Sequence, residues 1–284
     1  MPGALVLVAT PIGNLEDMTL RGLRLLREAD LIAAEDTRHT AKLLSHFGIT
    51  TRTVSLHEHN ERSRIPELLD RIQRGERVAV VTDAGMPAIS DPGFAVVAAA
   101  VAAGLKVEVV PGVSALTTAV AGAGLPTDVV TFVGFPPSRA GERARWMARW
   151  RETPGVLVLF EAPHRLRATL EALAQALGNR QVVVAHELTK VHESWHRGPL
   201  DKLIADKDLP AKGEFTILVG PATEMPDGQD AAALEPEQVG IEFGLMTKSG
   251  GMTRRDAIAE LAKRHGLRKR EVYSMVEAAK HSGE

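Results

Sequence analysis

The sequence predicts an α/β fold in which a largely parallel sheet is covered by helices on both faces. Eight runs of strand length, rich in β-branched and other apolar residues, recur along the chain, and stretches with helical periodicity lie between them. Most runs are continuously apolar rather than alternating, which is typical of strands buried on both faces. The runs lie at residues 5–9, 31–34, 78–82, 107–110, 129–133, 156–160, 182–185 and 215–219.

The length and composition exclude several classes of protein. A chain of 284 residues is long enough for two domains of ordinary size with an appendage, and 44% hydrophobic residues can form a sizeable core. The sequence contains no cysteine, which excludes disulfides, thiolate nucleophiles and cysteine-ligated metal clusters. Because no basic segment precedes the first apolar run, and Pro11 and Gly13 interrupt that run, we expect no signal peptide, no membrane span and a cytoplasmic protein.

Changes in composition along the chain suggest the domain boundaries. A stretch of small residues at 114–128 contains Gly122, Gly124 and Pro126, which would end a short helix, so we expect an N-terminal α/β domain at 1–116 and a C-terminal α/β domain at 117–222. Residues 220–242 contain six acidic residues, three prolines and no Lys or Arg. This composition predicts a solvated linker at 223–246, followed by a tail at 247–284.

The tail has a charge opposite to that of the rest of the chain. Nine Lys or Arg residues against five acids give it a charge of +4, while the remainder carries −6. Thr253 is a candidate N-cap of one short helix, Gly266 would end that helix, and Arg268, Lys269 and Arg270 open a second. Apolar stripes mark one face of each helix, at Ile258, Leu261 and Ala262 and at Val272, Met275, Val276 and Ala279. This helix-turn-helix outline suits phosphate contact, and a helix pair docked on the main domain with solvated cations is the alternative.

Three loops rich in Pro and Gly follow predicted strands. Their sequences are ATPIGN (9–14), TDAGMPAISDPG (82–93) and VPGVSAL (110–116). The first lacks both the dinucleotide and the P-loop glycine patterns, and taken alone each loop is an ordinary turn. Because loops at the carboxyl edge of one sheet converge, we favour a shared ligand cleft. Asp83 and Asp91 in the second loop would offset a cationic ligand group such as a sulfonium.

The remaining charged clusters do not match known hydrolase or metal motifs. Glu35, Asp36 and Arg38 lie just beyond a strand, and a local ion pair explains them equally well. His57 and His59 lack a third ligand at a recognisable spacing, which favours hydrogen bonding or RNA stacking over metal binding. The chain has no His-Glu-x-x-His motif, no Gly-x-Ser-x-Gly elbow and no glycosidase-like carboxylate pair.

Nine segments in order resemble the ribosomal RNA small subunit methyltransferase I family, whose fold is similar to that of the tetrapyrrole methylases. They are VATPIGNLEDMT, ADLIAAEDTR, HEHNE, VTDAGMPAISDPG, VPGVSAL, GFPP, FEAPHR, HELTK and GEFTILVG. The match covers about residues 4–222, and the basic tail resembles that family's C-terminal extension. The resemblance implies two α/β domains with S-adenosylmethionine (SAM) in the cleft between them, no metal, and a homodimer. It also implies that the substrate is the ribose 2′-hydroxyl of a decoding-centre cytidine of 16S rRNA in the small ribosomal subunit.

The resemblance also implies which residues bind the cofactor. Pro11 lies in the first loop, and Glu161 and Glu187 would close the other side of the cleft. The second and third loops contribute Ala84, Gly85, Met86, Ile89, Ser90, Ser114 and Ala115. The family usually has Thr where this chain has Met86, and Ser where it has Thr82. Because such loops commonly hold ligands through backbone groups, Met86 need not abolish binding, although it removes a side-chain hydrogen bond.

Methyl transfer from a sulfonium requires in-line placement of the acceptor oxygen and a base for its proton. Glu187 and Asp91 are the candidate bases, and Lys190 or Arg38 would steady the developing oxyanion or a neighbouring phosphate. Basic residues that would contact RNA phosphates are Arg38, His59, Arg139, Arg143, His164, Arg165 and residues 268–270.

Other functions remain open at this point. The same fold would permit a tetrapyrrole C-methyltransferase or a diphthamide-type protein methylase, although the basic tail favours RNA. A non-catalytic RNA-binding adaptor is the alternative from a different class, and Met86 is its one hint in the sequence.

Overall fold

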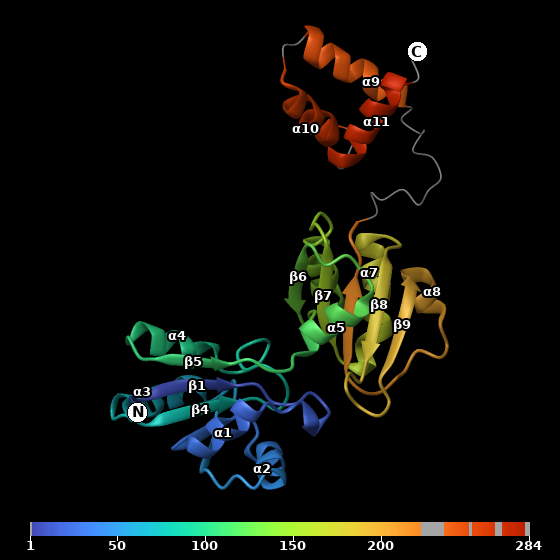
Figure 1. The fold of residues 1–284 in the computed structure, drawn as a ribbon. Coiled ribbons are helices and arrows are strands. Elements are labelled where there is room, and N and C mark those ends of the chain that lie inside the picture. Colours follow the sequence, from blue (N-terminus) through green and yellow to red (C-terminus); the bar gives the residue numbers. More distant parts are fainter. Residues whose placement is uncertain (1, 223–235, 250–251, 265–268, 282–284) are drawn as a thin grey trace. The chain divides into compact units, whose positions relative to one another are not determined.

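A computed structural model describes residues 2–222, 236–249, 252–264 and 269–281. The chain divides into two compact units, Met1–Thr223 and Glu224–Glu284. The first unit contains two five-stranded sheets, each with its own helices (Figure 1). The second unit is helical.

The first sheet is entirely parallel, as the sequence predicts. Its strands are β1 (Ala4–Val8), β2 (Leu31–Ala34), β3 (Thr53–Ser55), β4 (Arg77–Val81) and β5 (Val107–Val110), in the order β3-β2-β4-β1-β5. Because all five strands run in one direction, the loops after them meet at one edge of the sheet. β3 was missed by the sequence analysis.

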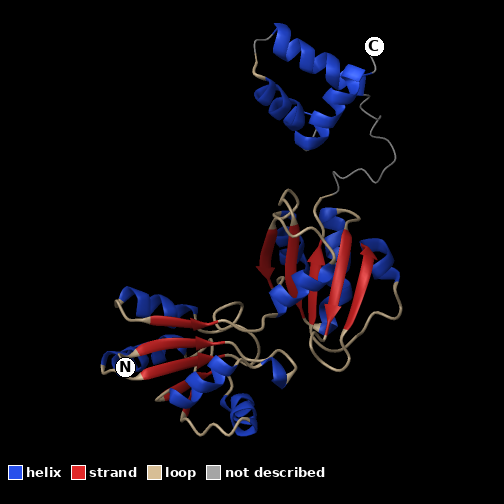
Figure 2. Cartoon of the chain, viewed as in Figure 1, coloured by secondary structure: helices blue, strands red, loops and turns tan. Residues whose placement is uncertain are grey.

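Helices cover both faces of the first sheet, as Figure 2 shows in blue and red. The helices are η1 (Leu15–Asp17), α1 (Leu20–Glu28), α2 (Thr37–His46), α3 (Glu61–Gln73) and α4 (Phe94–Ala102). Side chains of α1 and α2, such as Leu26 and Leu44, pack on one face against Val6. Side chains of α3 and α4, such as Leu68, pack on the other face. The continuous apolar runs are therefore explained by burial on both faces.

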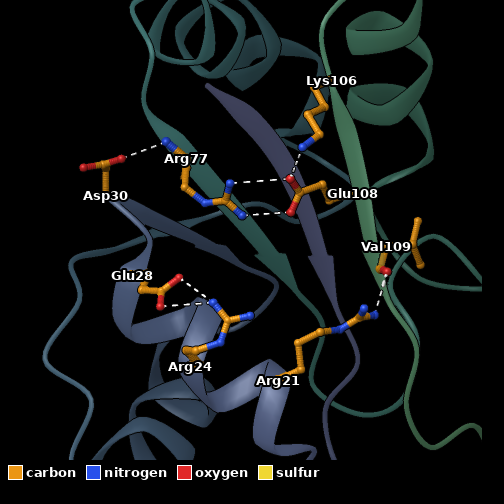
Figure 3. Close-up of polar contacts among 8 residues, drawn as sticks. All are labelled: Arg21, Arg24, Glu28, Asp30, Arg77, Lys106, Glu108 and Val109. Carbon is orange, nitrogen blue, oxygen red and sulfur yellow. Dashed lines mark hydrogen bonds and ion pairs between the residues drawn. The ribbon is translucent and has the colours of Figure 1, made fainter. Parts of the chain in front are cut away.

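Ion pairs close the amino-terminal edge of this sheet (Figure 3). The buried Arg77 guanidinium donates to the Glu108 carboxylate at 2.8 Å, and Lys106 Nζ lies 2.6 Å from the same carboxylate. Hydrogen bonds from Arg77 and then Lys106 lower the pKa of Glu108 to about 2. Asp30 accepts a hydrogen bond from the backbone N–H of Arg77 at 2.7 Å. These contacts join β4 and β5 across β1.

The second sheet is mixed, which corrects the expectation of a largely parallel arrangement. Its strands are β6 (Val130–Gly134), β7 (Val156–Glu161), β8 (Gln181–His186), β9 (Ser194–Pro199) and β10 (Phe215–Val219), in the order β6-β7-β10-β8-β9. Only β6 and β7 pair in parallel, and the other three pairings are antiparallel. The apolar runs report burial on both faces, and that burial does not depend on strand direction.

Helices also cover both faces of the second sheet. They are α5 (Ala115–Ala123), α6 (Ala140–Ala148), η2 (Pro163–Arg165), α7 (Leu166–Leu177) and α8 (Leu200–Ala205). α6, α7 and α8 pack on one face, and α5 packs on the other through Ala119 and Ala123. The expected boundary between residues 116 and 117 lies inside α5. Because all of α5 packs on the second sheet, we place the boundary before Ala115.

The second unit contains three helices within its described residues, α9 (Pro236–Gly244), α10 (Arg254–Arg264) and α11 (Lys269–His281), and a π-helical turn at Leu245–Ser249. Val239, Leu261, Val272 and Val276 form its core. The predicted apolar stripes of α10 and α11 therefore face this core, and Thr253 caps α10 through the backbone N–H of Asp256. α9 lies within the stretch expected to be a linker and packs on α11, where the Cβ of Ala279 closely approaches Gly240. The rest of the expected linker at 223–235 and the turn at 265–268 lie outside the described residues.

Within the described ranges, no helix is both long enough and apolar enough to cross a membrane.

Candidate active site

The first two Pro/Gly loops are joined directly to each other. Thr10 and Gly85 exchange two backbone hydrogen bonds of 2.9 Å, and the Thr10 hydroxyl donates to the Thr82 carbonyl at 3.0 Å. Gly85 has a φ of 82°, which a residue with a side chain rarely adopts. The loops after β1 and β4 therefore form one continuous surface at the carboxyl edge of the first sheet.

The second loop is held in a strained conformation. Ala88 and Ser90 have φ values of 67° and 64°, in the left-handed region that non-glycine residues seldom occupy. The Glu61 carboxylate fixes the end of this loop, because its Oε1 accepts hydrogen bonds from the backbone N–H groups of Gly93, Ala95 and Val96 at 2.9–3.2 Å. The last residue of the HEHNE segment is thus a support for the loop.

A first cavity of about 360 Å³ opens between this edge and the second sheet. All three Pro/Gly loops and the ends of β7, β8 and β10 contribute to its wall. The structure brings together eight of the nine predicted cofactor residues here: Ala84, Gly85, Met86, Ile89, Ser90, Ser114, Ala115 and Glu161. Pro11 instead lines a neighbouring cavity.

Glu161 is a buried member of the wall whose carboxylate is bound by the protein itself. It accepts from the backbone N–H of Ala162 at 2.8 Å, from the Arg165 guanidinium at 3.0 Å and from the Thr169 hydroxyl. Arg165 also donates to the Pro136 carbonyl. Arg143 is buried and donates to the Ser138 carbonyl at 2.9 Å. The expectation that Arg143 and Arg165 contact RNA is therefore wrong, because both guanidinium groups hold the loop after β6.

Carboxyl groups gather beside the first cavity. Burial, together with the nearby charges of Glu35 and Asp83, raises the pKa of Asp91 to about 7. Burial also raises the pKa of Glu35, although the hydrogen bond from the Asp83 backbone N–H opposes the shift. Within the described ranges, no hydrogen bond reaches the Asp91 carboxyl. A cation placed near Asp91 would therefore find an acceptor that the protein leaves available.

A second cavity of about 440 Å³ adjoins the first, and the two share Ile12, Ala84 and Glu214. The loop after β1, the start of α2 and the residues after β4 form most of its wall. Its lining residues are Thr10, Pro11, Ile12, Gly13, Leu15, His39, Thr40, Lys42, Leu43, Thr82, Asp83, Ala84, Lys190 and Glu214.

Lys190 connects two carboxylates at the side of the second cavity. Its Nζ donates to Glu187 at 2.9 Å and to Glu214 at 2.8 Å, and the Glu187 carboxylate also accepts from the backbone N–H of Glu214 at 2.8 Å. Burial acts to lower the pKa of Lys190, but the hydrogen bonds to Glu214 and Glu187 outweigh it and raise that pKa. Likewise, burial acts to raise the pKa of Glu187, and the hydrogen bonds from Lys190 and Glu214 lower it. Lys190 is thus held as a cation and Glu187 as an anion.

The predicted catalytic residues do not all reach a cavity. Asp91 lines the first cavity and Lys190 lines the second, whereas Glu187 lines neither. The Arg38 side chain is 90% exposed and pairs with Asp36 at 2.9 Å, outside both walls. Hydrogen bonds from Arg38 lower the pKa of Asp36 to about 2.

Some lining residues were missed by the sequence analysis, notably Glu214, Phe135 and Phe160. Glu214 lies in the GEFTILVG segment directly before β10, and that segment was taken only as a strand. Its position opposite Lys190 depends on the antiparallel pairing of β8 with β10, which the sequence does not reveal. Among the residues that the structure describes, no group of three or more His, Asp or Glu is placed to hold a metal ion.

Comparison with known proteins identifies the class to which this fold and site belong. Residues 4–204 match the family described as Tetrapyrrole (Corrin/Porphyrin) Methylases. A uroporphyrin-III C-methyltransferase from Thermus thermophilus in complex with S-adenosyl homocysteine is similar in structure, with a TM-score of 0.53 at 19% identity over 77% of this chain and 97% of that one. A diphthine synthase has a TM-score of 0.59 at 18% identity over 76% of this chain and 90% of that one. The fold is thus that of the tetrapyrrole methylases.

Sequence relatives narrow the class further. Ribosomal RNA small subunit methyltransferase I of Halalkalibacterium halodurans is 42% identical over 96% of this chain and 94% of its own length. The protein of that name from Synechocystis is 44% identical over 96% of this chain and 97% of its own length. The chain belongs to the ribosomal RNA small subunit methyltransferase I family within the tetrapyrrole methylases.

Proposed function

We propose that this protein transfers a methyl group from SAM to the ribose 2′-hydroxyl of a decoding-centre cytidine of 16S rRNA. The observation that carries the proposal is the 42–44% identity to two proteins named for small-subunit rRNA methylation, over 94–97% of their lengths. Those alignments cover 96% of this chain. The names support an rRNA methyltransferase, and the ribose position follows from the family resemblance of the sequence motifs.

The first cavity fits SAM as the methyl donor. Its volume of about 360 Å³ lies in the range of small-molecule sites, and Ile12, Ile89 and Phe135 give it apolar walls. Asp91 supplies a carboxyl that no described group bonds, suited to the positive charge of a sulfonium. SAM would supply an activated methyl group with a good leaving group, so the protein's task is to hold donor and acceptor in line.

The second unit and its approaches supply cations for RNA phosphates. Lys269 and Arg270 begin α11 and are exposed, and Arg139 is exposed on the first unit. Such residues hold a polyanion without reading its sequence, so their contribution should weaken as salt rises. The stated 2′-hydroxyl selectivity would then depend on the cavities rather than on the basic tail.

Comparison of acceptors tests the proposal. The full-length protein is mixed with methyl-labelled SAM and with small ribosomal subunits lacking the modification, free 16S rRNA, or a precorrin. Label on rRNA in either RNA sample supports the proposal. Label on the precorrin alone would assign the chain to tetrapyrrole methylation, and SAM binding without label on any acceptor would leave the RNA assignment wrong.

A further inference from the structure

The wall shared by the two cavities is where donor and acceptor must meet. If the first cavity holds SAM, a methyl group can leave it only toward a group on the other side of Ile12, Ala84 and Glu214. The second cavity provides that space. Of these three residues only Glu214 has an ionisable side chain, and its side chain is 74% exposed.

The second cavity has the polar groups that a phosphodiester-linked sugar requires. His39 and Lys42 are exposed on α2 at its side, where they can contact phosphates. Thr82 is 98% buried in its wall, and the Thr82 hydroxyl has no hydrogen-bond partner in the part of the chain that the structure describes. A buried hydroxyl of this kind is costly unless a bound molecule or a water satisfies it.

Three other ionisable groups near the shared wall are less suited to accept a proton there. Lys190 is protonated because its pKa is raised. The Glu187 carboxylate lines neither cavity and is bound by Lys190 and by the Glu214 backbone N–H. Asp83 lines the second cavity, but its Oδ1 accepts from the backbone N–H of Asp36 at 3.2 Å. In Glu214, Lys190 binds Oε2, and no hydrogen bond to Oε1 occurs among the described residues.

We propose that the second cavity holds the ribose of the acceptor nucleotide and that Glu214 is the base that takes its hydroxyl proton. This inference rests on the proposed function. The hydroxyl oxygen forms a bond to the methyl carbon as the carbon–sulfur bond breaks, and that electron pair stays on sulfur to give neutral S-adenosylhomocysteine. The hydroxyl proton passes to Glu214 Oε1 and then to solvent, so the products are a methyl ether, the thioether and one proton.

Lys190 is the positioning residue for Glu214. Its Nζ fixes Oε2 at 2.8 Å, which leaves Oε1 to face the acceptor. The first loop determines where the Lys190 stem lies, because a Cβ added at Gly13 would come within 2.4 Å of Lys190 Cγ. Gly13 therefore allows the loop after β1 and the loop after β8 to approach closely enough to place Glu214 at the shared wall.

The test compares Glu214→Gln with Glu193→Gln in the full-length protein. Glu193 lies on the loop after β8, accepts from Trp195 Nε1 at 2.9 Å, and lines neither cavity. We expect Glu214→Gln to lower kcat for transfer to rRNA by at least about a hundredfold, with SAM affinity and KM for RNA within threefold of the parent. Glu193→Gln should keep the parental kcat. A Glu214→Gln kcat within threefold of that of Glu193→Gln would overturn the inference, as would an unaffected Glu214→Gln beside an inactive Asp83→Asn.

A second pair of variants tests the cavity itself. Leu43→Trp places a large side chain in the wall of the second cavity, and Ser45→Trp places one on the exposed side of the same helix. Leu43→Trp should raise KM for RNA at least about tenfold while SAM affinity stays unchanged, and Ser45→Trp should change neither. Equal KM values for the two variants would place the acceptor elsewhere. If the parent protein labels no RNA at all, the proposed function fails before these variants are compared.

Discussion

Replacing Asp91 by Asn should stabilise the free protein at neutral and alkaline pH. Burial and the charges of Glu35 and Asp83 raise the pKa of Asp91 from its ordinary 3.8 to about 7, so folding disfavours its ionised form. The protonated carboxyl therefore favours the folded state. The contribution of Asp91 to stability is complete below about pH 4 and is lost as the pH rises through 7.

The magnitude follows from the size of the shift. About three pKa units correspond to about 4 kcal/mol at 1.36 kcal/mol per unit. Because the side chain is partly open to solvent, we halve this figure and expect Asp91→Asn to gain about 2 kcal/mol at pH 8 and nothing at pH 4. For a unit of this size, that gain corresponds to a rise in Tm of about 4–8 °C.

Thermal unfolding of Asp91→Asn and the parent at several pH values between 4 and 8 measures this effect. Asp128→Asn removes an exposed carboxylate and serves as the control, with no expected change in the pH dependence. A constant difference between Asp91→Asn and the parent over this range would refute the reasoning, and so would a lower Tm for the variant at pH 8.

Three further predictions follow from contacts described above. Glu108→Gln removes a carboxylate whose pKa is lowered to about 2, so its cost in unfolding free energy, about 1 kcal/mol at pH 7 after allowance for solvent screening, should disappear as the pH falls from about 4.5 through 2; urea titrations at each pH check this, and a cost that persists at pH 2 would argue against the Arg77 pair. Gly13→Ala should displace the Lys190 stem and lower the methyl-transfer kcat about tenfold without changing SAM affinity; unchanged kinetics would show that the loops do not need this close contact. Reversing the charge of Lys269 and Arg270 together should flatten the dependence of log K for rRNA on log salt by about one per lost phosphate contact, and an unchanged slope in filter binding would exclude α11 as an RNA contact.

The sequence predicts the buried part of the fold well because burial leaves a clear mark on composition. All eight apolar runs correspond to strands of the two sheets. The two missed strands, β3 and β9, are edge strands with half-buried, largely polar residues, and β9 ends in Pro199. Such strands carry neither a continuous apolar run nor a clean alternation.

Strand direction and chain-distant neighbours account for most of what the sequence could not give. Nothing in an apolar run distinguishes parallel from antiparallel pairing, so the placement of β10 between β7 and β8 was unforeseen. That placement brings Glu214 to Lys190 and leaves Glu187 outside both cavities. By contrast, the Pro/Gly loops were predictable as a group, because the strand ends that carry them meet at one sheet edge.

The helical unit shows a similar limit. The stripes of α10 and α11 follow the helical period and were foreseen, whereas α9 lies in an acidic, Pro-containing stretch whose overall composition suggested a linker. Val239 and Phe243, four residues apart, supply the apolar face that packs in the core of this unit. Composition averaged over 23 residues concealed that short periodic segment.

The most direct test of the central claim is the chemical position of the methyl group. Small ribosomal subunits lacking the modification are incubated with the full-length protein and labelled SAM, and the 16S rRNA is digested to nucleosides and separated. The account predicts label in 2′-O-methylcytidine and a reaction that Glu214→Gln slows at least about a hundredfold. Label on a nucleobase, or on a protein of the subunit instead of its rRNA, would contradict it.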